Sequence, residues 1–184
     1  TAPADLGDHI LGGIIARVCA TQPKVRIDMV LVNRYVDLVA EGVDVAIRTG
    51  HLKDSSLIAK SVGIARWAPF ASPDYLSAAP SLDSPQALRN HCCLQFTPLG
   101  KDSWTLTDTH GSVVVPLSGQ VMVNDVRVVR SMALAGEGIA LLPLYLCREA
   151  CAGGQLTRVL TDWHAKADPI HIVYPRQRFM PPRL

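Results

Sequence analysis

The stretch EGVDVAIRTG, residues 41–50, decides how we interpret the fold. Gly42 follows a short segment with helical periodicity and suits the left-handed position that ends a helix. Residues 43–47 then alternate apolar and other side chains, as in a β-strand. A helix that leads directly into an apolar strand favours a parallel sheet covered by helices. Ligands bind such sheets beyond the carboxyl ends of the strands, where Arg48 and Thr49 stand.

Upstream of this stretch, the sequence predicts a helix, a strand and a second helix. An apolar stripe favours a helix over about residues 4–20, with Pro3 and Asp5 in its first turn. Residues 27–32 alternate as a strand, and Asn33 suits the cap of a short helix that follows. We expect the turn residues that open the chain to follow the end of a further strand.

The middle of the chain repeats such signals. SPDYL at 72–76 and SPQAL at 84–88 predict two helix starts, each with a serine cap and proline in the first helical position. CCLQFT at 92–97 predicts a strand, and SWTLT and SVVVPL around the turn DTHG predict an antiparallel hairpin. A helix capped by Asn124 or Asp125 then precedes the apolar strand IALLP.

The order of elements favours two lobes. A capped helix, a glycine and a short apolar strand occur at residues 33–48 and again at 124–143. The closing strand PIHIVYP is expected to return to the first lobe, so that two crossings join the lobes near residues 66–71 and 168–174. We therefore expect a discontinuous first lobe and a continuous second lobe, which are residues 1–70 with 171–184 and residues 71–170.

Composition excludes several classes of protein. The 184 residues are 48% apolar, which is enough for one large domain or two small lobes. A net charge of +2 gives no electrostatic case for nucleic acid or a membrane surface as the partner of this chain. No apolar run reaches the roughly 20 residues that span a bilayer. Five cysteines without a CxxC pair predict reduced thiols and no structural zinc.

Catalytic motifs are also missing from the sequence. It has no GxSxG, P-loop, HExxH or GxGxxG pattern, and its histidines are scattered. We therefore expect no catalytic residue, no cofactor and no metal.

Five stretches, in order and at suitable spacing, resemble the effector-binding domain of LysR-type transcriptional regulators: VDLVAEGVDVAIRTGHLKDSSLIAKSVG, FASPDYLSAAPSLDSPQAL, NHCCLQF, MALAGEGIALLPLYL and VYPRQRFMPPR. The resemblance covers nearly the whole chain. It implies an α/β fold of two Rossmann-like lobes joined by two crossover strands, periplasmic-binding-protein-like (type 2). It also implies a small-molecule inducer in the inter-lobe cleft and an N-terminal winged helix-turn-helix that this chain lacks.

The same resemblance implies an inducer pocket at strand ends and helix starts. The matching positions are Pro3, Ala4, Asp5, Val32, Asn33, Arg48 and Thr49 in the first lobe, and Phe96, Thr97, Asn124 and Asp125 in the second. Hydroxyl groups at strand ends can bind an anion without a buried charge, so Thr49 and Thr97 form the strongest pair.

Each position also has a purely structural explanation. Asn33 and Asp125 can serve as helix caps alone, and Phe96 as plain core. Arg48 can pair with a nearby acid, either Asp44 or Asp54.

The family implies a cytoplasmic homodimer, a tetramer in the full-length protein, and DNA binding only through the missing N-terminal part, with no membrane partner. The first helix carries more apolar residues than a single core-facing stripe needs, so we expect it at the dimer interface, with the helix at 126–135 as the matching surface. Burial of both faces inside one lobe is the competing explanation.

Three other functions compete with this interpretation. One is an extracytoplasmic solute-binding receptor of the same architecture, and a less favoured one is a small-molecule enzyme. The third is a nucleic-acid surface built on Arg176, Arg178 and Arg183, which lacks the aromatic residues that such surfaces use.

Overall fold

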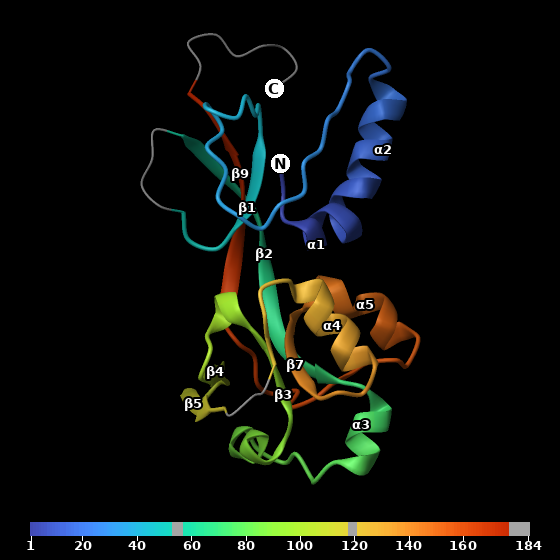
Figure 1. Ribbon diagram of the computed structural model, residues 1–184, viewed down its shortest axis with the longest axis vertical. Coiled ribbons are helices and arrows are strands. Elements are labelled where there is room, and N and C mark those ends of the chain that lie inside the picture. The colour runs from blue at the N-terminus through green and yellow to red at the C-terminus, as the bar shows by residue number, and fades with distance from the viewer. Residues whose placement is uncertain (53–56, 118–120, 177–184) are drawn as a thin grey trace. The chain divides into compact units, whose positions relative to one another are not determined.

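The computed structural model describes residues 1–52, 57–117 and 121–176 of a mixed α/β chain. The chain splits into two compact units (Figure 1). Unit 1 comprises Thr1–Ala65 with Asp168–Leu184, and unit 2 comprises Arg66–Ala167. Within the described residues, no helix is both long and apolar enough to cross a bilayer.

Unit 1 begins with a helical segment that confirms the expected first helix. α1 (Ala4–Leu6) continues through a π-helical turn (Gly7–Leu11) into α2 (Gly12–Thr21). Leu31 packs against Gly7, and a Cβ atom at that position would contact the Leu31 methyl groups and displace them. The glycine therefore allows the Leu31 side chain to lie close to the start of the helix.

The strands of unit 1 correct the expected parallel arrangement. β1 (Ala46–Thr49) confirms the strand predicted after Gly42, which adopts the left-handed conformation at φ +64°. β1 pairs antiparallel with β9 (Ala167–Tyr174), and β9 lies between β1 and β2 (Ile58–Ala71) in the sheet order. The closing strand was expected to return to the first lobe, and β9 does so; its pairing with β1 is antiparallel, whereas Thr1 and Ala2 pair in parallel with their neighbours.

Two predicted elements of unit 1 do not form. Residues 27–32 make no regular strand, and only Leu31 forms an isolated parallel bridge, to Ala2. The helix expected after Asn33 is replaced by a turn, in which the Asp37 carboxylate accepts hydrogen bonds from the backbone N–H groups of Val39 and Ala40. Such local capping competes with helix formation.

The hydrophobic cluster of unit 1 is small. Val36, Leu38, Ala46 and Val173 are buried together. Val36 and Leu38 are two residues apart, which is the spacing of an extended segment rather than a helix. The predicted helical stripe of Tyr35, Leu38 and Val39 was therefore wrong, and Tyr35 and Val39 are exposed.

Unit 2 follows the sequence prediction more closely. Its sheet contains β3 (Cys93–Phe96), β6 (Met122–Val123), β7 (Ile139–Pro143) and β8 (Thr157–Arg158). β3 pairs in parallel with β6 and with β7. β7 and β8 pair antiparallel with β2. The predicted hairpin forms from β4 (Ser103–Thr107) and β5 (Ser112–Pro116).

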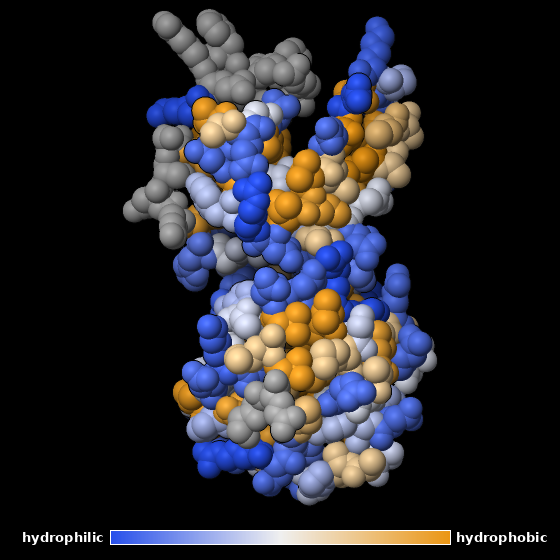
Figure 2. All heavy atoms as spheres, in the orientation of Figure 1, coloured by the Kyte–Doolittle hydropathy of each residue, from blue (hydrophilic) through white to orange (hydrophobic). Residues whose placement is uncertain are grey.

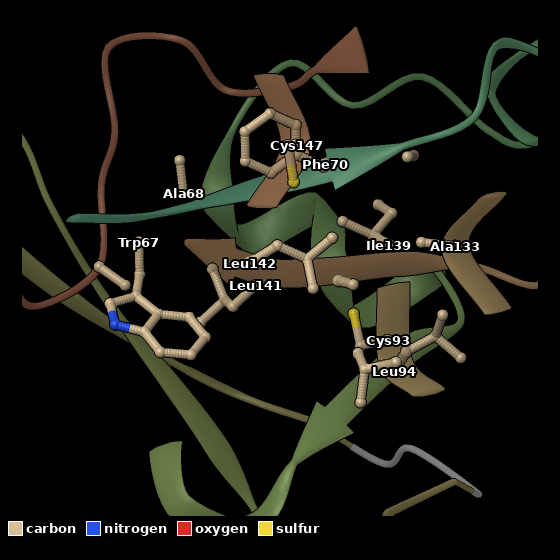
Figure 3. Packing of buried hydrophobic residues seen from close by; sticks show 14 of the residues in the cluster. Trp67, Ala68, Phe70, Cys93, Leu94, Ala133, Ile139, Leu141, Leu142 and Cys147 are labelled. Atoms are coloured by element: carbon tan, nitrogen blue, oxygen red, sulfur yellow. The ribbon is translucent and has the colours of Figure 1, made fainter. Parts of the chain in front are cut away.

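The helices of unit 2 are α3 (Pro73–Ala78), the 3-10 helices Pro85–Asn90 and Thr97–Leu99, α4 (Val126–Leu134) and α5 (Leu144–Ala152). Those that follow Ser72, Ser84 and Asp125 match predicted starts, whereas the 3-10 helix at Thr97 begins in the last residue of the strand predicted over 92–97. Figure 3 shows how residues of β2, β3 and β7 pack with α4 and α5 in the main core. The apolar run of β7 is buried along its whole length, as expected for a central strand covered on both faces.

Candidate functional site

The predicted residues of unit 1 follow three extended segments that run in parallel. Thr1 lies between Val45 and Ile47: its nitrogen donates to Val45 O, and Ile47 N–H donates to Thr1 O, both at 2.8 Å. Ala2 pairs on its other side, through Ala2 N–H to Val30 O at 3.2 Å and Val32 N–H to Ala2 O at 3.0 Å.

This pairing sets the neighbours of each predicted residue. Because Ala2 lies level with Leu31 and Thr1 with Ala46, the next row contains Val32, Pro3 and Arg48. Beyond this row, Asn33 follows Val32, Thr49 ends β1 and Ala4 begins α1. These predicted positions of unit 1 therefore lie at the carboxyl ends of the three paired segments, which we call the carboxyl edge of unit 1, and Asp5 follows in the first helical turn.

Asn33 connects two of these segments. Its Oδ1 accepts a hydrogen bond from Ala4 N–H at 3.3 Å. Asn33 was predicted to cap the helix that follows it, and that prediction was wrong because no such helix forms. It instead caps the first helix, which starts 29 residues earlier in the sequence.

Arg48 lies half-buried at the end of β1. Its Nη1 makes a long contact of 3.4 Å to Ile47 O, and its buried Nη2 has no hydrogen-bond partner among the described residues, which leave out 53–56. Burial is the largest influence on this guanidinium and lowers its pKa from the usual value. The pairing of Arg48 with Asp44 or Asp54 stays a prediction, since Asp54 lies outside the described residues.

In unit 2, Thr97 and Asn124 lie side by side at a second carboxyl edge. The parallel pairing of β3 with β6 places Phe96 level with Val123, and Thr97 and Asn124 follow directly. Asn124 is exposed and Thr97 is half-buried at the start of a 3-10 turn. Sheet register thus places the ends of β3 and β6, which Thr97 and Asn124 follow, at one edge. Thr49, which the sequence analysis paired with Thr97, lies in unit 1.

Asp125 caps α4, as the structural alternative to its predicted place in the inducer pocket had it. Its Oδ1 accepts from the Arg127 backbone N–H at 2.9 Å, and its Oδ2 forms an ion pair with Arg127 Nη2 at 2.6 Å. The hydrogen bonds from Arg127 are the largest cause of the lowered pKa of this carboxyl. Asp125 therefore caps α4, and the Arg127 side chain neutralises most of its negative charge.

The sequence analysis missed one side chain at this edge. Trp67 lies opposite Pro143, the last residue of β7, and its ring stacks on Phe96 with centroids 5.5 Å apart and planes inclined by 17°. Phe96 is thus half of an aromatic pair and only partly buried, which corrects its interpretation as plain core. Aligning the strands from sequence could have revealed this neighbour, but the register was not known.

Thiols form no second site. All five cysteines are free, and burial raises the pKa of Cys93 and of Cys147 to about 12. No group of three or more His, Cys, Asp or Glu side chains within the described ranges could hold a metal ion.

Comparisons with known proteins match this chain along its whole length. The model of the LysR substrate binding domain family matches residues 1–184. The HTH-type transcriptional regulator PtxR of Pseudomonas aeruginosa is 29% identical over 100% of this chain and 59% of its own length. The regulator CrgA of Neisseria meningitidis is 31% identical over 90% of this chain and 56% of its own length. The chain thus spans about three-fifths of these curated relatives.

Solved structures of such regulators have the same fold. The regulatory domain of CrgA from Neisseria meningitidis superimposes with a TM-score of 0.88 at 29% identity, covering 99% of this chain and 90% of that one. Full-length AphB, a virulence activator of Vibrio cholerae, gives 0.84 at 32% identity, covering 95% and 60%. These matches confirm the expected α/β, periplasmic-binding-protein-like fold (type 2). The chain therefore belongs to the LysR substrate-binding domain family, the inducer-binding regulatory domains of LysR-type transcriptional regulators.

Proposed function

We propose that this domain binds its small-molecule inducer through residues at the carboxyl ends of its strands. The observation that carries the proposal is the hydrogen bond from Ala4 N–H to Asn33 Oδ1 at 3.3 Å, which joins segments that are far apart in sequence at the end of unit 1 where Arg48 and Thr49 complete β1. Thr97 and Asn124 repeat the arrangement in unit 2. Such edges present backbone and side-chain polar groups to a ligand, while the buried sheet holds them in place.

The polar groups of unit 1 favour an inducer that carries a negative charge. Within the part of the chain that the structure describes, Arg48 has a buried guanidinium nitrogen without a partner, and a carboxylate can satisfy such a group through a charge-assisted hydrogen bond. Thr49 follows Arg48 at the end of β1, is exposed and supplies a hydroxyl.

A thermal-shift screen of small carboxylates tests the proposal. A carboxylate that binds only the folded domain raises its melting temperature by mass action. We expect Arg48→Met, which keeps the side-chain stem but removes the charge, to abolish most of that rise. An equal rise in Arg48→Met would remove Arg48 from the site, and no rise with any carboxylate would contradict the anionic inducer.

We further infer that the domain pairs with a second copy of itself through the first helix. No residue of α2 is buried, and apolar side chains gather along it (Figure 2), with Ile14 41% exposed. Apolar residues of the following segment are also exposed, among them Val30 at 52%. A surface of this kind on one element favours a protein partner over solvent.

Transcription regulation by the whole protein is part of the same proposal. The relatives are regulators of the helix-turn-helix type, and this chain matches only part of each. We propose that the full-length protein is cytoplasmic, is a tetramer, binds DNA through its N-terminal domain, and has no enzymatic activity. This chain alone should not bind duplex DNA in a gel-shift experiment at physiological salt, because its net charge is only +2.

A further inference from the structure

Trp67 has a buried hydrogen-bond donor that none of the described residues of unit 2 uses. The side chain is only 8% exposed, and its indole Nε1 has no hydrogen-bond partner within residues 66–117 and 121–167. Figure 3 shows the six-membered ring directed toward Leu141 and Leu142 and the indole nitrogen on the side away from them. The six-membered ring thus packs in the core, and the N–H group lies on the side of the indole away from Leu141 and Leu142.

Trp67 itself stands at the carboxyl edge of unit 2. Trp67 lies opposite Pro143, where β7 ends, and stacks on Phe96, where β3 ends. The next residue is Thr97, whose neighbour is Asn124. The aromatic pair therefore lies directly beside the polar residues of the edge.

Core packing alone does not account for a tryptophan at this position. Phenylalanine would supply a ring for stacking on Phe96 without a polar atom, whereas a buried N–H group that lacks a partner destabilises the folded state. Buried indole N–H groups usually have a hydrogen-bond acceptor. A ligand at the adjacent edge that supplies an acceptor would give the Trp67 N–H group the hydrogen bond that it lacks.

We propose that the indole N–H of Trp67 donates a hydrogen bond to an oxygen of the inducer, and that the Trp67–Phe96 pair packs against an apolar part of the same molecule. This inference rests on the proposed inducer site and adds the ligand class: an oxygen acceptor, such as a carboxylate, attached to an apolar body. Trp67 is then a specificity-determining residue, because a ligand without an acceptor leaves the donor unpaired.

Indole N–H resonances provide a direct test. In ¹⁵N-labelled protein the Trp67 resonance is identified by its disappearance in Trp67→Phe, and Trp104, which is buried in β4, serves as the internal control. The probes are benzoate, which has an oxygen acceptor on an apolar ring, and benzylamine, which has the same ring with a donor in its place.

We expect benzoate to shift the Trp67 resonance downfield in a saturable manner and to leave Trp104 unmoved, whereas benzylamine has no such effect. Trp67→Phe should bind benzoate about tenfold more weakly, because one hydrogen bond to a charged group is lost. The measurement on unsubstituted protein decides the question even if the variant folds poorly.

Other outcomes separate this inference from the proposed function. If benzoate shifts the backbone amide of Thr97 and leaves the Trp67 indole unmoved, or if Trp67→Phe binds equally well, the role of Trp67 is refuted and the site remains. If neither probe affects either residue, the inference in this form is overturned. The carboxylate thermal-shift screen with Arg48→Met then decides the proposed function independently.

Discussion

Asn33 Oδ1 accepts a hydrogen bond from the backbone N–H of Ala4, with an N···O distance of 3.3 Å. A side chain at the end of one extended segment thereby caps a helix that starts from another. The contact joins the segment that ends at Asn33 to the start of the first helix, so the geometry of the edge and the stability of the helix depend on the same amide.

Asn33→Ala should therefore destabilise the domain by about 1 kcal/mol, the usual effect of losing a helix cap. Urea unfolding followed by circular dichroism measures the change. Asn33→Asp retains an oxygen acceptor at a helix N-terminus and should be close to unsubstituted protein. Equal losses in both variants would contradict the capping role.

Removing a hydroxyl from either carboxyl edge should weaken inducer binding. Thr49→Val and Thr97→Val keep the side-chain volume, and each should lower affinity by about 1 kcal/mol while the unfolding transition stays intact. Isothermal calorimetry with a carboxylate found by thermal shift provides the measurement. Thr105→Val, an exposed threonine in β4 of the hairpin, is the matched control and should bind normally. Unchanged affinity in both site variants would refute the site.

Two serines in similar sequences allow a matched test of helix capping. Ser72 is 3% exposed and its Oγ accepts from the Tyr75 N–H at 3.2 Å, whereas Ser84, also followed by proline, makes no such bond. Ser72→Ala should lower the free energy of unfolding by about 1 kcal/mol, and Ser84→Ala should have little effect. Equal effects in chemical denaturation would show that the cap is not responsible.

The cysteines should divide by reactivity. Cys19 and Cys92 are exposed, whereas burial raises the pKa of Cys93 and Cys147 to about 12, so that almost no thiolate is available at pH 8. A disulfide reagent should modify the exposed pair quickly and the buried pair only after unfolding, as read by peptide mass spectrometry. Labelling of Cys93 at the rate of its neighbour Cys92 would contradict this assignment.

The dimer proposal predicts a selective effect of charge on the first helix. Ile14→Glu, at a residue 41% exposed on α2, should shift the domain toward monomer in light scattering, because association would bury the new carboxylate. Val39→Glu makes a similar change at a residue 72% exposed in a turn and should leave the dimer intact. A monomeric unsubstituted domain at tens of micromolar would refute the proposal.

Local sequence signals determined much of unit 2. The serine cap before Pro73, the hairpin around residues 108–111 and the apolar run of β7 each involve residues within a few positions of one another. Their physical causes, which are capping, turn geometry and strand burial, therefore act in any context. The family resemblance supplied the overall fold, and the comparisons confirmed it.

Only the tertiary structure decided which distant residues meet. The helix expected after Asn33 was wrong because the Asp37 carboxylate caps a turn there and Asn33 bonds to Ala4. The strand expected over residues 27–32 is reduced to the pairing of residues 30–32 with Ala2. Trp67 was missed because its relation to Phe96 depends on the register of strands that are separated in sequence. Backbone hydrogen bonds between remote segments carry no local sequence signature, and they alone bring the polar residues of each edge together.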